Sequence, residues 1–280
     1  MASPTDLIGR IEAIGTVPTS VAQIFSLISD PRAAAADFER VVRPDVGLTA
    51  NLLRCANSVF YRASREITSV KDAINRMGLR RVFEVAASGS FANAIPPVLT
   101  GYGLTAEAYW EHSVAVAVLA DRIGRAAGFT YPDLAFTAGL LHDLGKVVVA
   151  TFLTPTLNDP PSLALVSQEQ ELLGTDHTEL GSLLAAKWNL PKEIAGAARW
   201  HHDPEGATTA TLRYLATVVQ VADGAAHTLT ESTRHSAQLD LGALERLTLE
   251  PERIAALVEG AKPEIERTTE MLKGVSRRAA

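Results

Sequence analysis

Apolar residues recur at helical spacing along almost the whole chain. Alternating strand-type patterns are nearly absent, and β-branched runs such as 147–150 are short. No repeat with a period of roughly 20 to 50 residues is visible. The pattern therefore predicts an all-α fold.

Prolines and glycines divide the first part of the chain into helices. Residues 38–61 read as two helices around the Pro44-Asp45 turn, and 67–95 read as two more, broken at Gly78. The segment AIPPVLTGYG (94–103) holds two prolines and two glycines within ten residues, and a helix does not cross such a segment easily. We therefore predict an N-terminal helical lobe over residues 1–100.

The rest of the chain predicts a second helical lobe over residues 101–235, which holds all seven histidines. Residues 236–280 contain two amphipathic segments, 241–247 and 251–274, the second with Pro263 inside it. We expect these C-terminal helices to pack on the second lobe or to form an oligomer surface. The oligomeric state is left open.

Composition narrows the class of protein. A chain of 280 residues is near the upper size of one core, which favours two helical subdomains or one large domain. The net charge of -6 argues against broad electrostatic binding to nucleic acid or anionic lipid. The start has no signal-peptide pattern, and no apolar run reaches the roughly 18 to 20 residues that span a bilayer. We expect a cytoplasmic protein without membrane contact, and we interpret the single cysteine, Cys55, as a buried apolar residue.

One stretch, G139-L-L-H-D-L-G-K146, sets a histidine and an aspartate side by side inside an apolar run. Burying a charged group costs several kcal/mol unless it is paired or bound to a metal. His142 shares a helical face with Ala135, Ala138 and Gly139, and these small residues would let another helix approach closely.

Further histidines and aspartates occupy or adjoin apolar helical faces. Each has an ordinary explanation alone, such as a core hydrogen bond or a solvated helix end. Asp176-His-Thr-Glu179 reads as a helix N-cap, which puts His177 in a first turn. His227 lies one turn beyond Asp223 and could contribute to the set, although a surface role is favoured for it, and His235 reads as solvent-exposed. Together, one cation, or two that share carboxylates, would satisfy the whole set: His112, His142, Asp143, His177, His201, His202 and Asp223.

Several of these motifs resemble those of a known protein superfamily. H112-S…G139-LLHDLGK146…D223 resembles the HD superfamily of metal-dependent phosphohydrolases, and His177 with the His201-His202 doublet resembles its HD-GYP branch. The segments 17–31, 44–62 and 67–82 resemble the HDOD domain, a helical signalling module. The resemblance covers roughly residues 10–230. It implies an all-α, two-lobed HDOD fold with an HD-type helical bundle as the second lobe, in a bacterial regulatory setting.

The resemblance also implies roles for individual residues. The seven positions above would be the metal ligands of a di-metal site, with iron or manganese favoured over zinc, nickel or magnesium. Lys146 matches a family lysine that can meet a phosphate, and Asp143 could bridge the two metals, so these two are the catalytic candidates. The doublet is followed by HHDPEGATTA, without a Gly-Tyr-Pro motif, so the resemblance does not extend to hydrolysis of cyclic di-GMP.

Three functions stay open from the sequence. The favoured one is a regulatory protein with a metal-binding core that acts through signalling protein partners. The alternative is an active phosphohydrolase on a nucleotide or cyclic dinucleotide, which would make a phosphorylated nucleotide the ligand. The least supported is a DNA-binding regulator, because Arg76, Arg80 and Arg81 read as a solvated helix start in an acidic chain.

Overall fold

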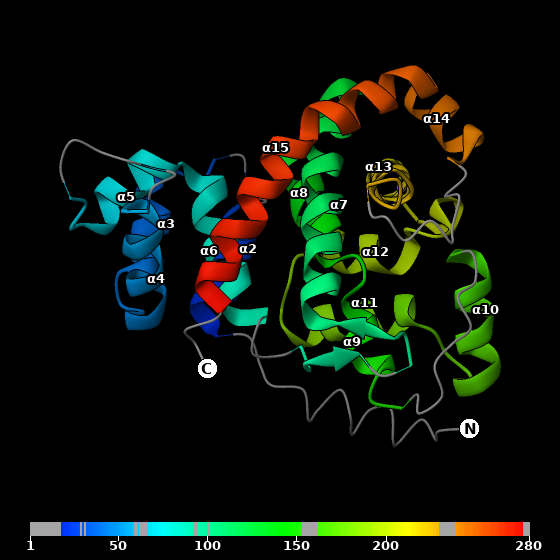
Figure 1. Cartoon of the computed structure of the whole chain (residues 1–280), viewed down its shortest axis with the longest axis horizontal. Helices are drawn as coiled ribbons and strands as arrows, with labels where there is room; N and C mark the ends of the chain where they lie inside the picture. Colours follow the sequence, from blue (N-terminus) through cyan, green and yellow to red (C-terminus); the bar gives the residue numbers. More distant parts are fainter. Residues whose placement is uncertain are drawn as a thin grey trace. The chain divides into compact units, whose positions relative to one another are not determined.

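The described part of the chain is almost entirely helical (Figure 1). The computed structural model describes residues 18–276, with gaps at 29, 31, 59–60, 62–65, 92–94, 100, 153–161 and 230–238. A short antiparallel pair joins β1 (Val98–Leu99) to β2 (Leu104–Thr105). The predicted all-α fold in two lobes is confirmed, since the described residues form two compact units. Unit 1 is Pro96–Ile265, and unit 2 combines residues 18–95 with 266–276.

Unit 2 is built from short helices whose ends follow the sequence signals. Asp45 caps α4 by accepting a hydrogen bond from the Leu48 peptide N–H, and Gly78 ends α5 with φ +80°. The two predicted pairs of helices are thereby confirmed. The rings of Phe25 and Phe83 meet edge to face in the core, 4.7 Å apart. The helices are α2 (Thr19–Ile28), α3 (Ala35–Val42), α4 (Val46–Ala56), α5 (Val70–Met77) and α6 (Leu79–Phe91).

A buried ion-pair cluster corrects one prediction in unit 2. The Glu84 side chain is fully buried and pairs with Arg80 at 3.2 Å and with Arg81. Arg81 also donates to the Thr268 hydroxyl at 2.9 Å. The solvated helix start expected here is wrong for both arginines, because a buried carboxylate needs their guanidinium groups as partners. Two of the three arginines behind the DNA-binding interpretation are therefore engaged by Glu84.

Unit 1 is organised around α7 (Ala106–Ala126), whose residues 114–120 are all buried. Helix α7 packs against α8 and α13, α9 packs against α11, and α11 packs against α12. The remaining elements are α8 (Pro132–Leu141), α9 (Leu144–Val149), α10 (Ser162–Leu173), α11 (His177–Lys187), α12 (Lys192–Trp200), the 3-10 turn η2 (Pro204–Gly206), α13 (Ala210–Ala226), α14 (Leu241–Leu247) and α15 (Pro251–Ser276).

Two glycines allow these helices to touch backbone to backbone. A Cβ atom on Gly139 would lie 2.9 Å from the Val116 carbonyl oxygen of α7, which confirms the predicted close approach of a helix. A Cβ atom on Gly145 would overlap the His177 carbonyl oxygen and lie 2.6 Å from the Gly181 nitrogen. The start of α9 is thus held directly against the first turn of α11.

The C-terminal helix α15 contributes to both units. It is 26 residues long and continues through Pro263, and contacts group it with unit 2 from Glu266 onward. The Arg81–Thr268 contact accounts for the grouping of the end of α15 with unit 2, and the packing of the C-terminal helices on the second lobe or in an oligomer surface stays a prediction. The boundaries drawn at 100 and 235 stay a prediction. No helix in the described ranges is both long and apolar enough to cross a bilayer.

Candidate metal centre

The HD pair lies in the turn between α8 and α9. His142 is the C-terminal cap residue of α8, and Asp143 precedes the first turn of α9. Both are buried, with 0% and 2% of the residue exposed. The His142 Nδ1–H donates to the Gly139 carbonyl at 2.8 Å, which leaves Nε2 to bind either a proton or a metal ion.

Two more buried histidines are held in the same way. The His201 Nδ1–H donates to the Ala198 carbonyl at 2.9 Å, at the end of α12. His177 opens α11, and the predicted N-cap is confirmed because the Asp176 carboxylate accepts from the peptide N–H groups of Thr178 and Glu179. The His177 Nδ1–H donates to the Glu169 carboxylate at 2.7 Å, so both rings present Nε2 to the centre, which is the arrangement of metal-binding histidines.

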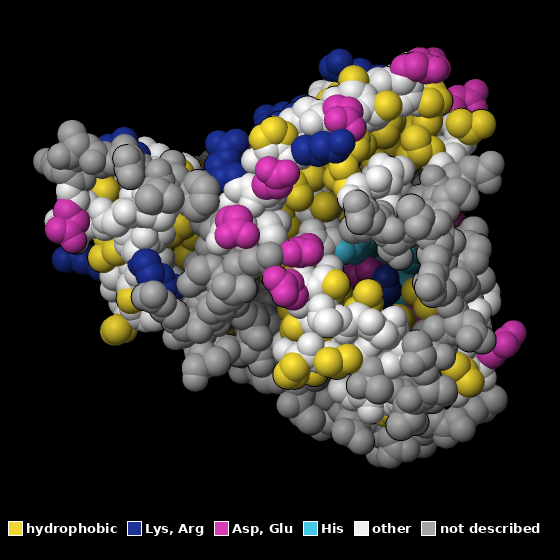
Figure 2. Space-filling view, in the orientation of Figure 1, with side chains coloured by type: hydrophobic (Ala, Val, Ile, Leu, Met, Phe, Trp, Pro, Cys, Tyr) yellow, Lys and Arg dark blue, Asp and Glu magenta, His cyan; other side chains and the backbone are white. Residues whose placement is uncertain are grey.

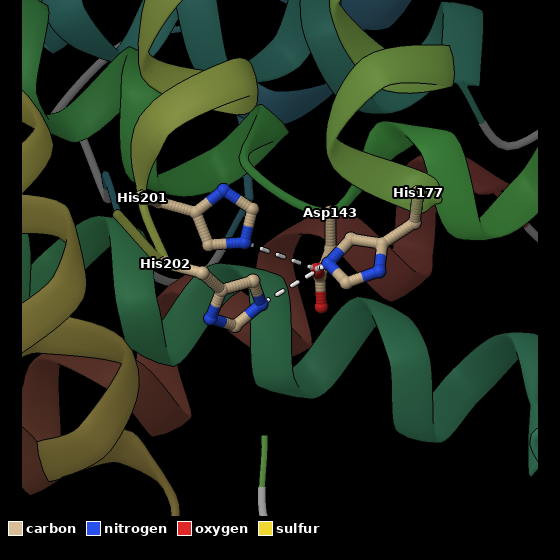
Figure 3. A group of neighbouring side chains, drawn as sticks. All are labelled: Asp143, His177, His201 and His202. Atoms are coloured by element: carbon tan, nitrogen blue, oxygen red, sulfur yellow. Dashed lines mark hydrogen bonds and ion pairs between the residues drawn. The ribbon is translucent and has the colours of Figure 1, made fainter. Parts of the chain in front are cut away.

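We call Asp143, His177, His201 and His202 the inner cluster (Figure 3). Their ligand atoms all lie within 4.8 Å of one another. The Asp143 Oδ1 atom lies 3.5 Å from the His177 Nε2 and 3.7 Å from the His201 Nε2. The His177 and His202 Nε2 atoms are 3.1 Å apart. Three imidazoles and one carboxylate oxygen thus face a common point.

A second group, which we call the outer cluster, consists of His112, Asp223 and His227. The Asp223 Oδ1 atom lies 3.0 Å from the His112 Nε2 and 3.4 Å from the His227 Nε2. His142 joins the two clusters, because its Nε2 lies 3.7 Å from the Asp223 Oδ1 and 3.3 Å from the Asp143 Oδ2. The two oxygens of Asp143 therefore face different neighbours.

Several of these buried atoms have no hydrogen-bond partner. In the part of the chain that the structure describes, five such atoms belong to this centre. An unsatisfied buried polar atom costs about 1–3 kcal/mol, and such groups are rare away from functional sites. A cation would satisfy all five at once, so the residues present fit a bound metal. The atoms are His112 Nε2, His142 Nε2, Asp143 Oδ1, His201 Nε2 and Asp223 Oδ1.

The electrostatics of the centre also suit a cation. Burial lowers the pKa of His201 well below its usual value and that of His202 to about 3, so both rings are neutral at physiological pH. Burial also opposes a charged His142, but the Asp143 carboxylate outweighs it and raises the pKa of His142 to about 10. Burial acts to raise the pKa values of Asp143 and Asp223, yet the neighbouring imidazoles hold both well below the usual range. The carboxylates therefore attract positive charge between them.

The Lys146 side chain is held by a carboxylate of the centre. Its ammonium pairs with the Asp143 Oδ2 atom and lies 5.9 Å from the centroid of the Tyr102 ring. The side chain is 13% exposed, so it still reaches the edge of the site. Burial opposes its charge, but Asp143 raises the pKa of Lys146 and keeps it protonated.

Sequence reasoning missed one residue of the centre, Glu169, and favoured a surface role for a second, His227. Glu169 of α10 is fully buried, and its carboxylate accepts from the His177 Nδ1–H and the His177 peptide N–H, each at 2.7 Å, and from the Tyr102 hydroxyl at 2.6 Å. The 40% exposed side chain of His227 belongs to the outer cluster. Its spacing of four residues from Asp223 on one helix was the available signal. His235 lies outside the described residues.

The centre opens to solvent on one side. His142, Asp143, His177 and His201 are buried, whereas His112, His202 and His227 are partly exposed. Figure 2 shows a hollow in which histidine, acidic and basic side chains are visible at the floor. The structure thus brings together all seven predicted positions, and their role as ligands stays a prediction.

Comparison with known proteins places the chain in a family. The model of the HDOD domain matches residues 14–204, and the chain belongs to the HDOD family. The resemblance found in the sequence is thereby confirmed.

Three relatives illustrate the match. A crystal structure of an HDOD domain protein of unknown function from Geobacter sulfurreducens superposes with a TM-score of 0.68 at 26% identity, covering 96% of this chain and 98% of that one. A ribonuclease Y from Thermus thermophilus is 33% identical over 54% of this chain and 21% of its own length. An uncharacterised protein from Treponema pallidum is 26% identical over 69% of this chain and 38% of its own length. The chain therefore spans well under half of the curated relatives it matches.

Proposed function

We propose that this chain is an HDOD-type regulatory protein whose unit 1 holds a divalent-metal centre and which acts through signalling protein partners. The main support for a bound metal is the set of five buried nitrogen and oxygen atoms that face one another without hydrogen-bond partners. The division of the chain supports the regulatory role, because all seven histidines follow residue 111 and unit 2 contains none.

The donor set supports two transition-metal ions. Imidazole nitrogens with a few carboxylate oxygens suit iron, manganese, zinc or nickel, whereas magnesium and calcium prefer oxygen ligands alone. The family resemblance favours iron or manganese among them. Asp143 would help to hold both ions, since its Oδ1 faces the inner cluster and its Oδ2, which also pairs with Lys146, faces His142.

Elemental analysis of tag-free protein tests the centre. We expect about two equivalents of metal in the wild type and none in the His142→Ala, Asp143→Ala double variant. Asp133→Ala is the matched control, because it removes a half-exposed carboxylate from the same helix α8 and should leave the metal content unchanged. A wild-type protein without metal, after reconstitution with Fe²⁺ or Mn²⁺, would overturn the proposal.

Hydrolysis of a phosphodiester is the second candidate function, and the partly exposed ammonium of Lys146 next to Asp143 favours it. When bound, a pair of divalent cations lowers the pKa of water and neutralises the charge of a phosphodiester. Lys146 reaches the edge of the site and can donate to a phosphate oxygen, while Asp143 fixes the position of its ammonium. The matched Thermus relative bears the name of a ribonuclease.

A substrate screen separates the two candidates. Nucleotides, cyclic dinucleotides and short RNA are offered to the Mn²⁺- or Fe²⁺-loaded protein. If the chain is a hydrolase, Lys146→Ala lowers turnover by about 100-fold or more and keeps the metal, because the lysine meets the substrate rather than the ions. Absence of metal-dependent turnover on every substrate leaves the regulatory proposal and removes the hydrolase.

A further inference from the structure

We propose that His227 is a metal ligand, and that it completes, with His112 and Asp223, the outer of the two metal positions, at the solvent side of the centre, for a first-row transition dication. The inference rests on the proposed metal centre and goes beyond it, because His227 is outside the seven-residue set and a surface role was favoured for it.

The local structure of α13 brings the first two donors together. Asp223 and His227 are four residues apart, so their side chains leave the same face of the helix. His227 is the cap residue that follows α13, yet its backbone is still helical, with φ -60° and ψ -22°. The carboxylate and the imidazole therefore project in nearly the same direction.

Helix α7 supplies the third donor from the opposite side. Since α7 packs against α13, His112 faces Asp223 across the helix interface, with its Nε2 3.0 Å from the Asp223 Oδ1. The rings of His112 and His227 are 4.8 Å apart and tilted by 32°. The three ligand atoms lie within 4.8 Å of one another, as donors around one ion do.

The Asp223 oxygen indicates a cation rather than a set of ordinary ion pairs. Three imidazole nitrogens surround its Oδ1, at 3.0 Å (His112), 3.4 Å (His227) and 3.7 Å (His142). The Oδ1 atom is buried, and it accepts no hydrogen bond from the described residues. Protonating several adjacent rings would place like charges side by side, whereas one cation between neutral rings satisfies the oxygen and the nitrogens together.

The chemistry and exposure of these donors define the ligand. Two imidazoles and one carboxylate form a borderline donor set, which suits Mn²⁺, Fe²⁺, Co²⁺ or Zn²⁺ and leaves coordination positions for water. The His227 side chain is 40% exposed, against 0% for His177. The outer position is therefore the more accessible one, and His227 governs how firmly it retains its ion.

Calorimetric titration of the metal-free 280-residue chain with Co²⁺ tests this assignment, with visible absorbance as a second readout. We expect two Co²⁺ per chain in the wild type. His227→Ala should weaken one binding event by about tenfold or more and leave the other unchanged, whereas His177→Ala should weaken the event that His227→Ala spares. His227→Gln keeps the side-chain volume and should reproduce the loss, which excludes a folding defect.

Thr228→Ala is the matched control, because Thr228 is the exposed neighbour of His227 and its hydroxyl donates to the Ala225 carbonyl. Two Co²⁺ bound with wild-type affinities by both His227 variants would overturn the inference and leave the metal centre intact. A single Co²⁺, lost in His177→Ala and kept in His227→Ala, would also overturn it. No Co²⁺ in the wild type would overturn the proposed metal centre itself.

Discussion

Both units of this protein bury carboxylates, and they satisfy them in opposite ways. In unit 2, Glu84 is fully buried and lies between two guanidinium groups. In unit 1, Asp143 and Asp223 each keep a buried oxygen without a hydrogen-bond partner, although histidines surround them. A buried charge matched by side chains of the same chain belongs to the fold, which loses stability when one partner is removed. A buried charge left for an external partner marks a binding site.

The largest effect on stability is expected when the buried carboxylate of unit 2, Glu84, is replaced. Glu84→Gln removes the buried carboxylate that pairs with Arg80 and Arg81, and loss of one member of a buried pair costs about 3–5 kcal/mol. Urea unfolding followed by circular dichroism should show a lower free energy of unfolding. The metal content should not change, and a loss of metal in this variant would contradict the separation of roles.

Removal of the metal tests whether a cation satisfies the buried carboxylates of unit 1. A ligand that binds only the folded state at about 100 times its Kd stabilises it by about 2.7 kcal/mol. A chelator should therefore lower the free energy of unfolding of the wild type by about that amount. Asp223→Asn should show a smaller chelator effect, since one binding position is impaired. Equal unfolding curves with and without chelator would argue against metal in the folded protein.

Gly145 tests whether the geometry of the inner cluster depends on the backbone contact between α9 and α11. In Gly145→Ala the new Cβ would overlap the His177 carbonyl, so α9 must move away from α11. We expect a loss of about 1–3 kcal/mol and weaker metal binding, because Asp143 moves with α9. Gly47→Ala is the control, since a Cβ there meets only the Asp45 Oδ1 at 3.6 Å inside helix α4. That variant should be as stable as the wild type or slightly more so.

Glu169 differs from Asp143 and Asp223, because it is a buried carboxylate of unit 1 that accepts hydrogen bonds at both of its oxygens. Glu169→Gln weakens the acceptor that orients the His177 ring, and loss of such a partner costs about 10–100-fold in metal affinity. Competition with a chelating dye measures the change, with Tyr102→Phe as the milder variant, since it removes only the hydroxyl that donates to Glu169. Unchanged affinity in both variants would show that Glu169 does not position the ring.

Particular residues show how far sequence reasoning reached. The breaks at Pro44-Asp45 and Gly78 and the cap at Asp176 are local signals, because a cap or a left-handed glycine acts within one turn of its helix. The close helix approach at Gly139 was also accessible, since a small residue beside His142 on one helical face has few other uses.

Other features depend on contacts between residues far apart in the chain. Arg81 meets Thr268 across 187 positions, and no helical period links them. Glu169 lies outside the HD pattern, and only the packing of α10 on α11 brings it to His177. His112 lies on α7, so the sequence of α13 alone did not show that His227 lies beside it.

The sequence by itself determined the all-α class, the family, and the seven positions of the H…HD…H…HH…D series, because helical periodicity and short motifs are encoded locally. Only the tertiary structure decided which oxygen of Asp143 faces which histidine, that Lys146 is engaged by Asp143, and that His227 and Glu169 belong to the centre. The physical reason is that hydrogen bonds and metal coordination act over about 2–4 Å, and such distances are fixed by how helices pack rather than by spacing along one of them.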